Sequence, residues 1–243
     1  MKIAIAQMSS KDGDVKFNIK THINAILKAS KQNVDYLLFP ELSLTGYELK
    51  KASKLAFTID DVRLEKLIQT CMKNKITVSV GAPIFDNEQL FIGTFIIKDD
   101  GTIETYFKIH LHGNENKYFS KGIHPSLINI KNTKIANAIC ADTNEESHIE
   151  MCVSLGIDVY AAGVVFSKSF YDNDTNKLAS YAKKYNILVL MANYNKPTGG
   201  YDSAGKSAIW DKNGLLVSAN KTDNILVMVE KNGLKNIGKI ISL

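Results

Sequence analysis

A cysteine that follows an apolar run is the first candidate for chemistry in this sequence. Cys140 comes directly after Lys134–Ile139, a run typical of a β-strand, and before a segment with helical spacing. The unpaired N–H groups at the start of a helix lower the pKa of a nearby thiol and favour a nucleophilic thiolate. An inert thiol packed in the core is the commoner fate of a single cysteine in this position, so position alone leaves both interpretations open.

Two charged residues also stand directly behind apolar runs. Glu41 follows Leu37–Pro40, where a carboxylate is poorly solvated and its raised pKa would suit proton transfer. A helix N-cap or an ion pair is the alternative role for Glu41. Lys108 follows Tyr106 and Phe107 and, taken alone, is typical of an edge lysine whose ammonium reaches solvent. Beside a cysteine and a glutamate, the same ammonium could stabilise a developing oxyanion.

The histidines raise two further possibilities. A metal site could be built from residues close together in the sequence: His110, His112, Glu115 and His124. Their spacing is not a recognised zinc pattern, so we expect hydrogen-bonding loop histidines and no metal. His148 lies eight residues after Cys140 and could be the base of a Cys-His pair, although this separation does not determine whether the two side chains lie close together, and Glu41 is preferred as the base.

Strands and helices alternate along the chain, as the spacing of apolar residues indicates. The expected strands are Ile3–Met8, Asp35–Phe39, Ile76–Gly81, Leu90–Lys98, Thr102–Phe107, Lys134–Ile139, Ile157–Ala162, Ile187–Ala192, Ser207–Asp211, Leu215–Ala219 and Ile225–Val229. The expected helices are Phe17–Lys31, Val62–Asn74, His148–Leu155 and Asn176–Tyr185. This alternation predicts an α/β fold, in which ligands bind beyond the carboxyl ends of strands. Glu41, Lys108 and Cys140 each follow a strand, and no linker divides the chain, so we expect one domain over residues 1–243.

Composition excludes several classes of protein. With 45% hydrophobic residues and 15 glycines among 243 residues, the chain is neither disordered nor collagen-like. Its lysines are scattered, so the net charge of +5 does not indicate nucleic-acid binding. Its apolar runs are far shorter than the ~20 residues of a membrane span. The N-terminus is unlike a secretory signal and three cysteines suit a reducing compartment, so we expect a cytoplasmic protein without nucleic-acid or membrane partners.

Four motifs in order give the chain a resemblance to a known family. They are Phe39–Tyr47, which contains Glu41; Phe107–Leu111, which contains Lys108; Glu115–Phe119; and Ala138–Asp142, which contains Cys140. In order and separation they resemble the glutamate, lysine, second glutamate and cysteine motifs of the nitrilase superfamily, the carbon-nitrogen hydrolases. The resemblance extends from near Met1 to about Glu230.

The resemblance implies an α-β-β-α sandwich whose subunits pair into a four-layer assembly, so a homodimer is expected. It also implies that Cys140 attacks the carbonyl carbon of an amide while Glu41 takes the thiol proton. Lys108 and the backbone N–H of Ala141 would hold the oxyanion, and Glu115 would orient the substrate or Lys108. Water activated by Glu41 would then release the thioacyl group. Neither a metal nor an organic cofactor is implied.

Two aromatic residues that follow strand ends, Tyr47 and Phe166, are expected to bind substrate together with Ala141, although packing in the core is the commoner role of any one aromatic residue. The sequence departs from the family pattern at Thr143–His148, where many members have Phe-Pro-Glu, and in its short tail after Glu230. The expected activity is hydrolysis of a small amide or carbamoyl compound. Nitrile hydrolysis, N-acyl transfer to an acceptor other than water, and a non-catalytic binding or regulatory protein of the same fold are the alternatives.

Overall fold

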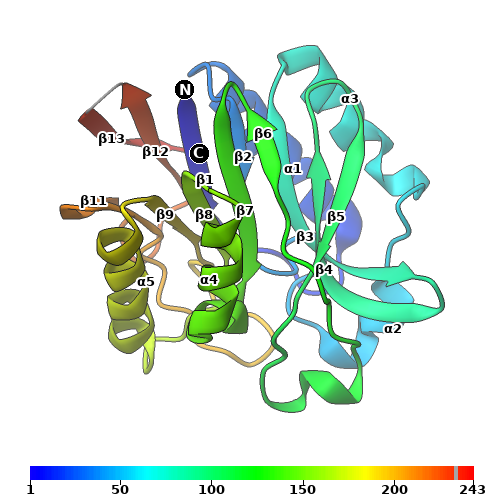
Figure 1. The fold of residues 1–243 in the computed structure, drawn as a ribbon. Coiled ribbons are helices and arrows are strands. Elements are labelled where there is room, and N and C mark those ends of the chain that lie inside the picture. Colours follow the sequence, from blue (N-terminus) through cyan, green and yellow to red (C-terminus); the bar gives the residue numbers. More distant parts are fainter. Residues whose placement is uncertain (233–234) are drawn as a thin grey trace.

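The computed structural model describes residues 1–232 and 235–243. Two β-sheets face each other, and helices cover the outer face of each sheet (Figure 1). Helices α1 (Val15–Ser30) and α3 (Glu65–Asn74) cover one sheet, and the short α2 (Ala52–Leu55) contacts the same sheet. Helices α4 (Glu146–Ser154) and α5 (Tyr171–Tyr185) cover the other sheet. The α-β-β-α sandwich expected from the sequence is therefore confirmed.

The first sheet has seven strands in the order β13-β12-β1-β2-β3-β4-β5, and the second has six in the order β11-β10-β9-β8-β7-β6. The bounds in the first sheet are β1 (Lys2–Gln7), β2 (Tyr36–Leu38), β3 (Thr77–Asp86), β4 (Gln89–Ile97), β5 (Ile103–Phe107), β12 (Ile225–Asn232) and β13 (Lys235–Ser242). Those in the second are β6 (Ile128–Ile130), β7 (Thr133–Ile139), β8 (Val159–Gly163), β9 (Leu188–Ala192), β10 (Ala208–Asp211) and β11 (Gly214–Ser218). The central strands β1, β2 and β3 run parallel, as do β7, β8 and β9, so the carboxyl ends of each set share one edge.

The strands are apolar on both faces because each sheet is buried on both sides. In β1, Ile3 and Ile5 pack into the core between the sheets, whereas Ala4 and Ala6 pack in the layer beneath α1 and α3. Successive side chains of a strand point to opposite faces, so a strand covered on both faces needs apolar residues at every position. This explains the continuous apolar runs in the sequence.

Several elements differ from the expectation based on sequence. The short α2 and β6 were not expected, and three other differences have a clear physical reason. Helix α5 begins earlier than predicted, because Asp172 and Asp174 in its first turn suit the positive end of the helix dipole although they break the apolar spacing. Strand β3 continues past Gly81 to Asp86, because it pairs along its length with β4. Strand β13 pairs with β12 in a tail where lysines and a glycine obscure the strand pattern.

Two glycines allow the segment that carries Glu41 to pass close to both sheets. A Cβ atom at Gly81 would lie 2.4 Å from the backbone nitrogen of Leu42. A Cβ atom at Gly163 would lie 2.7 Å from the carbonyl oxygen of Phe39. A side chain at either position would therefore displace the backbone on one side of Glu41.

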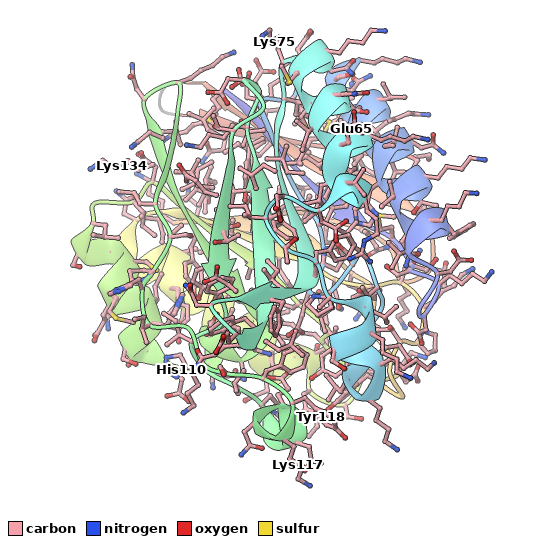
Figure 2. All side chains as sticks on the ribbon, turned by 90° about the vertical axis from the view of Figure 1, so that its right-hand side faces the viewer. Glu65, Lys75, His110, Lys117, Tyr118 and Lys134 are labelled. Carbon is pink, nitrogen blue, oxygen red and sulfur yellow. The ribbon has the colours of Figure 1, made fainter. Side chains whose placement is uncertain are left out.

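Surface lysines and buried cysteines lie where the sequence indicated. Lys75, Lys117 and Lys134 are exposed and extend from different parts of the molecule (Figure 2). The three cysteines are free, and Cys71 and Cys152 are buried among core residues. In the part of the chain that the structure describes, none of the helices has both the length and the apolar character needed to span a bilayer.

Candidate active site

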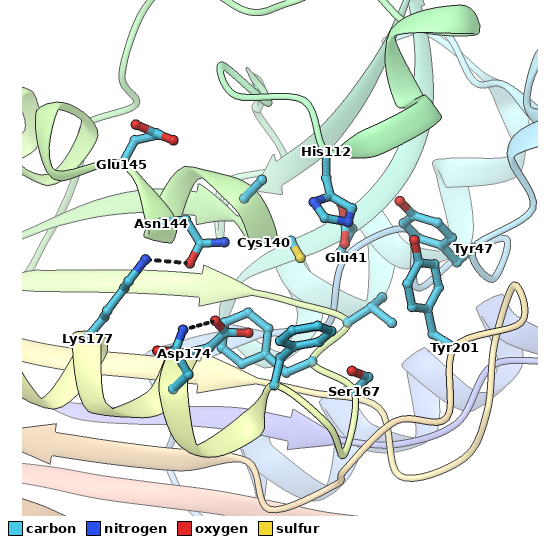
Figure 3. Close-up of a pocket in the computed structure, with 15 residues that line it drawn as sticks. Glu41, Tyr47, His112, Cys140, Asn144, Glu145, Ser167, Asp174, Lys177 and Tyr201 are labelled. Atoms are coloured by element: carbon cyan, nitrogen blue, oxygen red, sulfur yellow. Dashed lines mark hydrogen bonds between the residues drawn. The ribbon is translucent and has the colours of Figure 1, made fainter.

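A cavity of about 480 Å³ lies beyond the carboxyl ends of β2, β7 and β8 (Figure 3). Five residues expected from the sequence line it: Glu41, Tyr47, Cys140, Ala141 and Phe166. Two others, Lys108 and Glu115, are buried behind this lining. Lys108 donates a hydrogen bond to Glu41, and Glu115 accepts one from Tyr47. The structure therefore brings all seven residues together.

Cys140 lies at the sharp turn between β7 and the 3₁₀ helix Cys140–Asn144. Its backbone φ of 44° is in the left-handed region, where a residue with a side chain is strained, and such strain is concentrated at functional sites. Its sulfur faces the cavity (Figure 3), and the N–H of Val165 is directed at it. Burial and the Glu41 carboxylate raise the pKa of the Cys140 thiol, although Lys108 opposes the shift. The thiol therefore needs a base to become a nucleophile.

Glu41 provides a buried carboxylate with one unused oxygen. Its Oε1 accepts a hydrogen bond from Lys108 Nζ at 2.7 Å, whereas its Oε2 is buried without a partner among the described residues. Burial raises the pKa of Glu41 to about 7, and Lys108 opposes this shift while Glu115 adds to it. The neighbouring Cys140 thiol is the group placed to supply a proton to Glu41. A base with a pKa near neutrality suits proton transfer in both directions.

Lys108 follows β5 and is fully buried. Its Nζ donates to Glu41 Oε1 at 2.7 Å and to Glu115 Oε1 at 2.8 Å. Burial alone would lower the pKa of Lys108, but the acidic groups of Glu41, Cys140 and Glu115 outweigh burial and raise it. Because an ammonium has three N–H donors, these two bonds leave one donor of Lys108 unused.

Glu115 lies in the 3₁₀ helix Gly113–Lys117 and fixes Lys108 from the other side. Its Oε1 accepts hydrogen bonds from Lys108 Nζ and from the Tyr47 hydroxyl, and its Oε2 accepts the backbone N–H of His112 at 2.7 Å. Tyr47 also packs edge-on against Tyr201, with 5.2 Å between the ring centroids. The Tyr47 hydroxyl is thus used to hold Glu115, while both tyrosines line the cavity.

Asp142 joins the segment that carries Lys108 to the turn that carries Cys140. Its Oδ1 accepts the backbone N–H groups of the two residues after Lys108, at 3.1 and 2.8 Å. Its Oδ2 accepts the N–H of the residue before Cys140 at 2.9 Å and the hydroxyl of Tyr106 at 2.7 Å. Since Lys108 follows the first sheet and Cys140 the second, one buried carboxylate links the two sheets at the site.

His148 belongs to the same buried cluster as Asp142 and does not bond to Cys140. Its Nε2 contacts the Tyr106 hydroxyl at 2.7 Å, and its Nδ1 contacts the Tyr160 hydroxyl at 2.8 Å. Burial lowers the pKa of His148 and favours the neutral ring. Because Tyr106 donates to Asp142, we assign the ring proton to Nε2, which leaves Nδ1 to accept from Tyr160. This arrangement does not support a Cys-His hydrolase.

The candidate metal ligands are not gathered into a site. Among residues 1–232 and 235–243, no group of three or more His, Cys, Asp or Glu side chains is arranged to hold a metal ion. Glu115 bonds to Lys108 and Tyr47 instead, and the side chain of His112 lines the cavity.

Several contributions to the cavity were not expected from the sequence. Tyr201 follows a pair of glycines, and only the path of that loop brings it to the site. Val165 contributes a backbone N–H, which no side-chain pattern reveals. Asp142 lies within the cysteine motif, but its bonds depend on the neighbouring sheet. Asp174 and Lys177 also line the cavity. The sequence feature that could have pointed to them is their spacing of three residues near the start of a helix that follows a strand.

The sequence profile of the family "Carbon-nitrogen hydrolase" matches residues 2–232. The chain is 27% identical over 232 residues to a glutamine-dependent NAD(+) synthetase of Thermotoga maritima, an alignment that covers 91% of this chain and 40% of the synthetase. It is 24% identical over 160 residues to an (R)-stereoselective amidase of a Pseudomonas species, covering 65% of this chain and 58% of the amidase. The chain thus spans less than two thirds of the length of either relative.

Solved structures of an amidase from Nesterenkonia sp. AN1, which belongs to the nitrilase superfamily, share the fold. One aligns with a TM-score of 0.86 at 20% identity, covering 96% of this chain and 92% of the amidase. Other structures of that amidase contain acrylamide or butyramide. In a further one, the acetamide moiety of fluoroacetamide is covalently added at the active site cysteine.

Proposed function

Because the chain belongs to the carbon-nitrogen hydrolase family, we propose that it is an amidase that cleaves a small amide with Cys140 as its nucleophile. The observation that carries this proposal is the buried Lys108 ammonium, held 2.7 Å from Glu41 and 2.8 Å from Glu115 beside the Cys140 cavity. The Nesterenkonia amidase, with amides in its structures and an acetamide moiety on its cysteine, supports an amide as the substrate.

In the first step, Glu41 Oε2 takes the proton of the Cys140 thiol, and the sulfur attacks the carbonyl carbon of the amide. A carbon–sulfur bond forms, and the electron pair of the carbonyl bond moves to oxygen. The remaining N–H of Lys108 and the backbone N–H of Ala141 receive this negative charge. Donors already fixed in a buried site stabilise such charge far better than water does, because they need no reorientation.

In the second step, protonated Glu41 gives its proton to the amide nitrogen, the carbon–nitrogen bond breaks, and ammonia leaves a thioester on Cys140. A water molecule then enters, gives a proton to Glu41 and attacks the thioester carbon. The carbon–sulfur bond breaks, the carboxylic acid leaves, and the proton on Glu41 returns to sulfur. The pKa of about 7 allows Glu41 to accept and return protons near neutral pH.

The other expected residues position these groups. Glu115 holds Lys108 through its Oε1, and Tyr47 holds Glu115 through its hydroxyl. Phe166 contributes an apolar wall to the cavity beside Ala141. We therefore assign substrate contact to Phe166 and Ala141, and a positioning role as well as wall contact to Tyr47.

The test is ammonia release from small amides, carbamoyl compounds and nitriles by the wild type, Cys140→Ala and Cys71→Ala. Cys71 is a buried cysteine of α3, on the far side of the first sheet from the cavity, and serves as the matched control. We expect release by the wild type and Cys71→Ala, and none by Cys140→Ala. Equal release by all three proteins would remove Cys140 from the mechanism. A thioester trapped with hydroxylamine would identify the acyl intermediate.

We also propose that the chain acts as a homodimer and that residues 1–243 form one domain. The proposed dimer is supported by the family resemblance. Light scattering should give twice the mass of 26.9 kDa, and a value of one chain would overturn the dimer. The cytoplasmic location stays a prediction from the sequence.

A further inference from the structure

One end of the cavity is charged and comes from α5. Figure 3 shows Tyr47 and Tyr201 on one side of Cys140, and Asp174 and Lys177 on the other. Asp174 and Lys177 are three residues apart on α5, so they share one helix face, with about 5–6 Å between Cβ atoms. Both side chains are half-buried and line the cavity.

Neither of these two charged groups forms a direct ion pair with another described residue. Lys177 Nζ contacts only Asn144 Oδ1 at 3.4 Å, and Asp174 Oδ1 contacts only Asn173 Nδ2 at 3.4 Å. Both distances are at the outer limit of a hydrogen bond. Lys184 on the same helix, by contrast, forms an ion pair with Glu146 at the surface. Asp174 and Lys177 form no direct ion pair with each other, although the Lys177 ammonium is close enough to oppose the rise in the pKa of Asp174.

Burial has a cost for these unpaired groups. Burial raises the pKa of Asp174, which means that its carboxylate is poorly solvated. A charge half removed from water gains most from a ligand of opposite charge. The other titratable groups that face the cavity at this end are Glu145 and His112, and both are exposed to solvent.

We propose that Asp174 and Lys177 form a subsite for a zwitterionic head group, and that the substrates are ω-amides of α-amino acids. The Asp174 carboxylate would take the ammonium of the substrate, the Lys177 ammonium would take its carboxylate, and the amide would lie at Cys140. Asn144, beside Lys177, and Asn173, beside Asp174, can donate hydrogen bonds to the same head group or accept them from it. This inference rests on the proposed amidase function and narrows its substrate class.

A substrate with a single charge fits the subsite less well. A carboxylate alone leaves Asp174 unpaired and close to a like charge, and an ammonium alone does the same to Lys177. An uncharged amide leaves both groups half-buried and unpaired. Only a head group that carries both charges satisfies the two residues together.

The test uses four amides that share a butanamide unit and differ in whether its far end carries an ammonium, a carboxylate, both or neither. They are L-glutamine, 4-carbamoylbutanoate, 4-aminobutanamide and butanamide. We expect the wild type to have its highest kcat/KM with L-glutamine and its lowest with butanamide, about tenfold lower for each charge removed. Asp174→Asn should lower kcat/KM about tenfold for the two ammonium-bearing amides and leave butanamide within about twofold. Lys177→Gln should do the same for the two carboxylate-bearing amides.

Asp172→Asn and Lys183→Gln are the matched controls, because they remove the same charges from exposed positions of α5 that do not line the cavity. Neither should change the ratios between the four amides. Equal effects of Asp174→Asn on all four amides, or a wild type that does not distinguish them, would overturn the subsite. The proposed amidase function would still stand if butanamide hydrolysis depended on Cys140.

A binding measurement covers the case in which no amide of the panel is hydrolysed. Calorimetry with Cys140→Ala should then rank the affinities of the four amides in the order expected for kcat/KM, with L-glutamine tightest. The double variant Cys140→Ala/Asp174→Asn should lose the preference for L-glutamine. Absence of L-glutamine binding to Cys140→Ala would overturn the subsite. Ammonia release that Cys140→Ala does not diminish would instead overturn the proposed function.

Discussion

Two buried polar clusters meet at the Cys140 turn, and they differ in how fully their hydrogen bonds are satisfied. The ion cluster consists of Glu41, Lys108 and Glu115, and the support cluster consists of Asp142, Tyr106, His148 and Tyr160. In the ion cluster, one carboxylate oxygen is buried without a partner. In the support cluster, every side-chain nitrogen and oxygen has a partner within the described chain.

This difference separates the groups that we propose to react from the groups that hold them. A buried polar network that is fully satisfied is rigid, whereas a missing bond leaves a place for a proton or a substrate atom. The ion cluster therefore has the free acceptor and the free ammonium donor that amide hydrolysis needs. The support cluster fixes the distance between the segments on which those groups are carried.

The largest effect is expected from Glu41→Gln in the ion cluster. The amide side chain keeps the shape of the glutamate but cannot take the thiol proton, so kcat/KM should fall by about 10²–10⁴-fold. Urea unfolding should show no loss of stability, because a buried carboxylate with an unsatisfied oxygen is replaced by a neutral group. Activity above a tenth of the wild-type value would contradict the role of Glu41 as base.

The pH profile of the reaction should follow the same group. Since the pKa of Glu41 is raised to about 7, kcat/KM should rise with pH to a plateau just above 7 and fall about tenfold per pH unit below it. The apparent pKa belongs to the coupled ion cluster and not to Glu41 alone. A flat profile between pH 5 and 8 would show that the base is another group.

Protein stability should respond to pH with opposite sign in the two clusters. The pKa of Glu41 is raised from 4.5 to about 7 on folding, so the free energy of unfolding should fall by roughly 3 kcal/mol as pH rises across this range. The pKa of His148 is lowered from 6.5, so its contribution is lost as pH falls below about 6.5.

Urea unfolding at several pH values, with Glu41→Gln and His148→Gln, separates the two contributions. Glu41→Gln should remove the loss of stability between pH 4.5 and 7, and His148→Gln should weaken the loss on the acid side. Burial lowers the pKa of His22 to about 4, so both variants should still lose some stability at acid pH through this residue. Identical curves for the wild type and Glu41→Gln would contradict the raised pKa.

Asp142→Asn tests whether the support cluster acts on the reaction. The new NH₂ group must face N–H or O–H donors, so the free energy of unfolding should fall by about 1–3 kcal/mol. We also expect kcat to fall about tenfold with little change in KM, because Lys108 shifts relative to Cys140 while the cavity wall persists. A loss of stability with an unchanged kcat would limit Asp142 to a structural role.

The smallest effect is expected from Tyr47→Phe. This change removes one hydrogen bond to Glu115 and leaves the bonds from Lys108 and from the His112 backbone. Loss of one such bond is worth about 1 kcal/mol, so kcat should fall about fivefold. A rise in KM without a change in kcat would show that the Tyr47 hydroxyl binds substrate instead of positioning Glu115.

The sequence could predict that Glu41, Lys108 and Cys140 lie together, because strand ends place them. Glu41, Lys108 and Cys140 each follow an apolar run, and the ends of such strands meet at one edge of a sheet. The family resemblance added Glu115, which the structure bonds to Lys108. The order of the main strands and helices was predictable for the same reason, since both faces of each strand are buried.

The remaining contacts depend on how the two sheets are stacked, which periodicity does not describe. Asp142 bonds to a segment of the opposite sheet, and Tyr201 reaches Tyr47 only through the path of a long loop. His148 was a candidate base by its distance in sequence, but the tyrosines on both sides of its ring decide its role. Strand β13 was missed because its lysines and Gly238 interrupt the apolar pattern.

The two glycines beside the Glu41 segment determine where this enzyme can diverge. A side chain at Gly81 or Gly163 would displace the backbone next to Glu41, so we expect substitutions there to be tolerated poorly because of their size, whatever their chemistry. The wall contributed by α5 contains no glycine and no such close approach. A change in the substrate preference of the proposed amidase should therefore arise from substitutions in α5, while the backbone beside Glu41 stays the same.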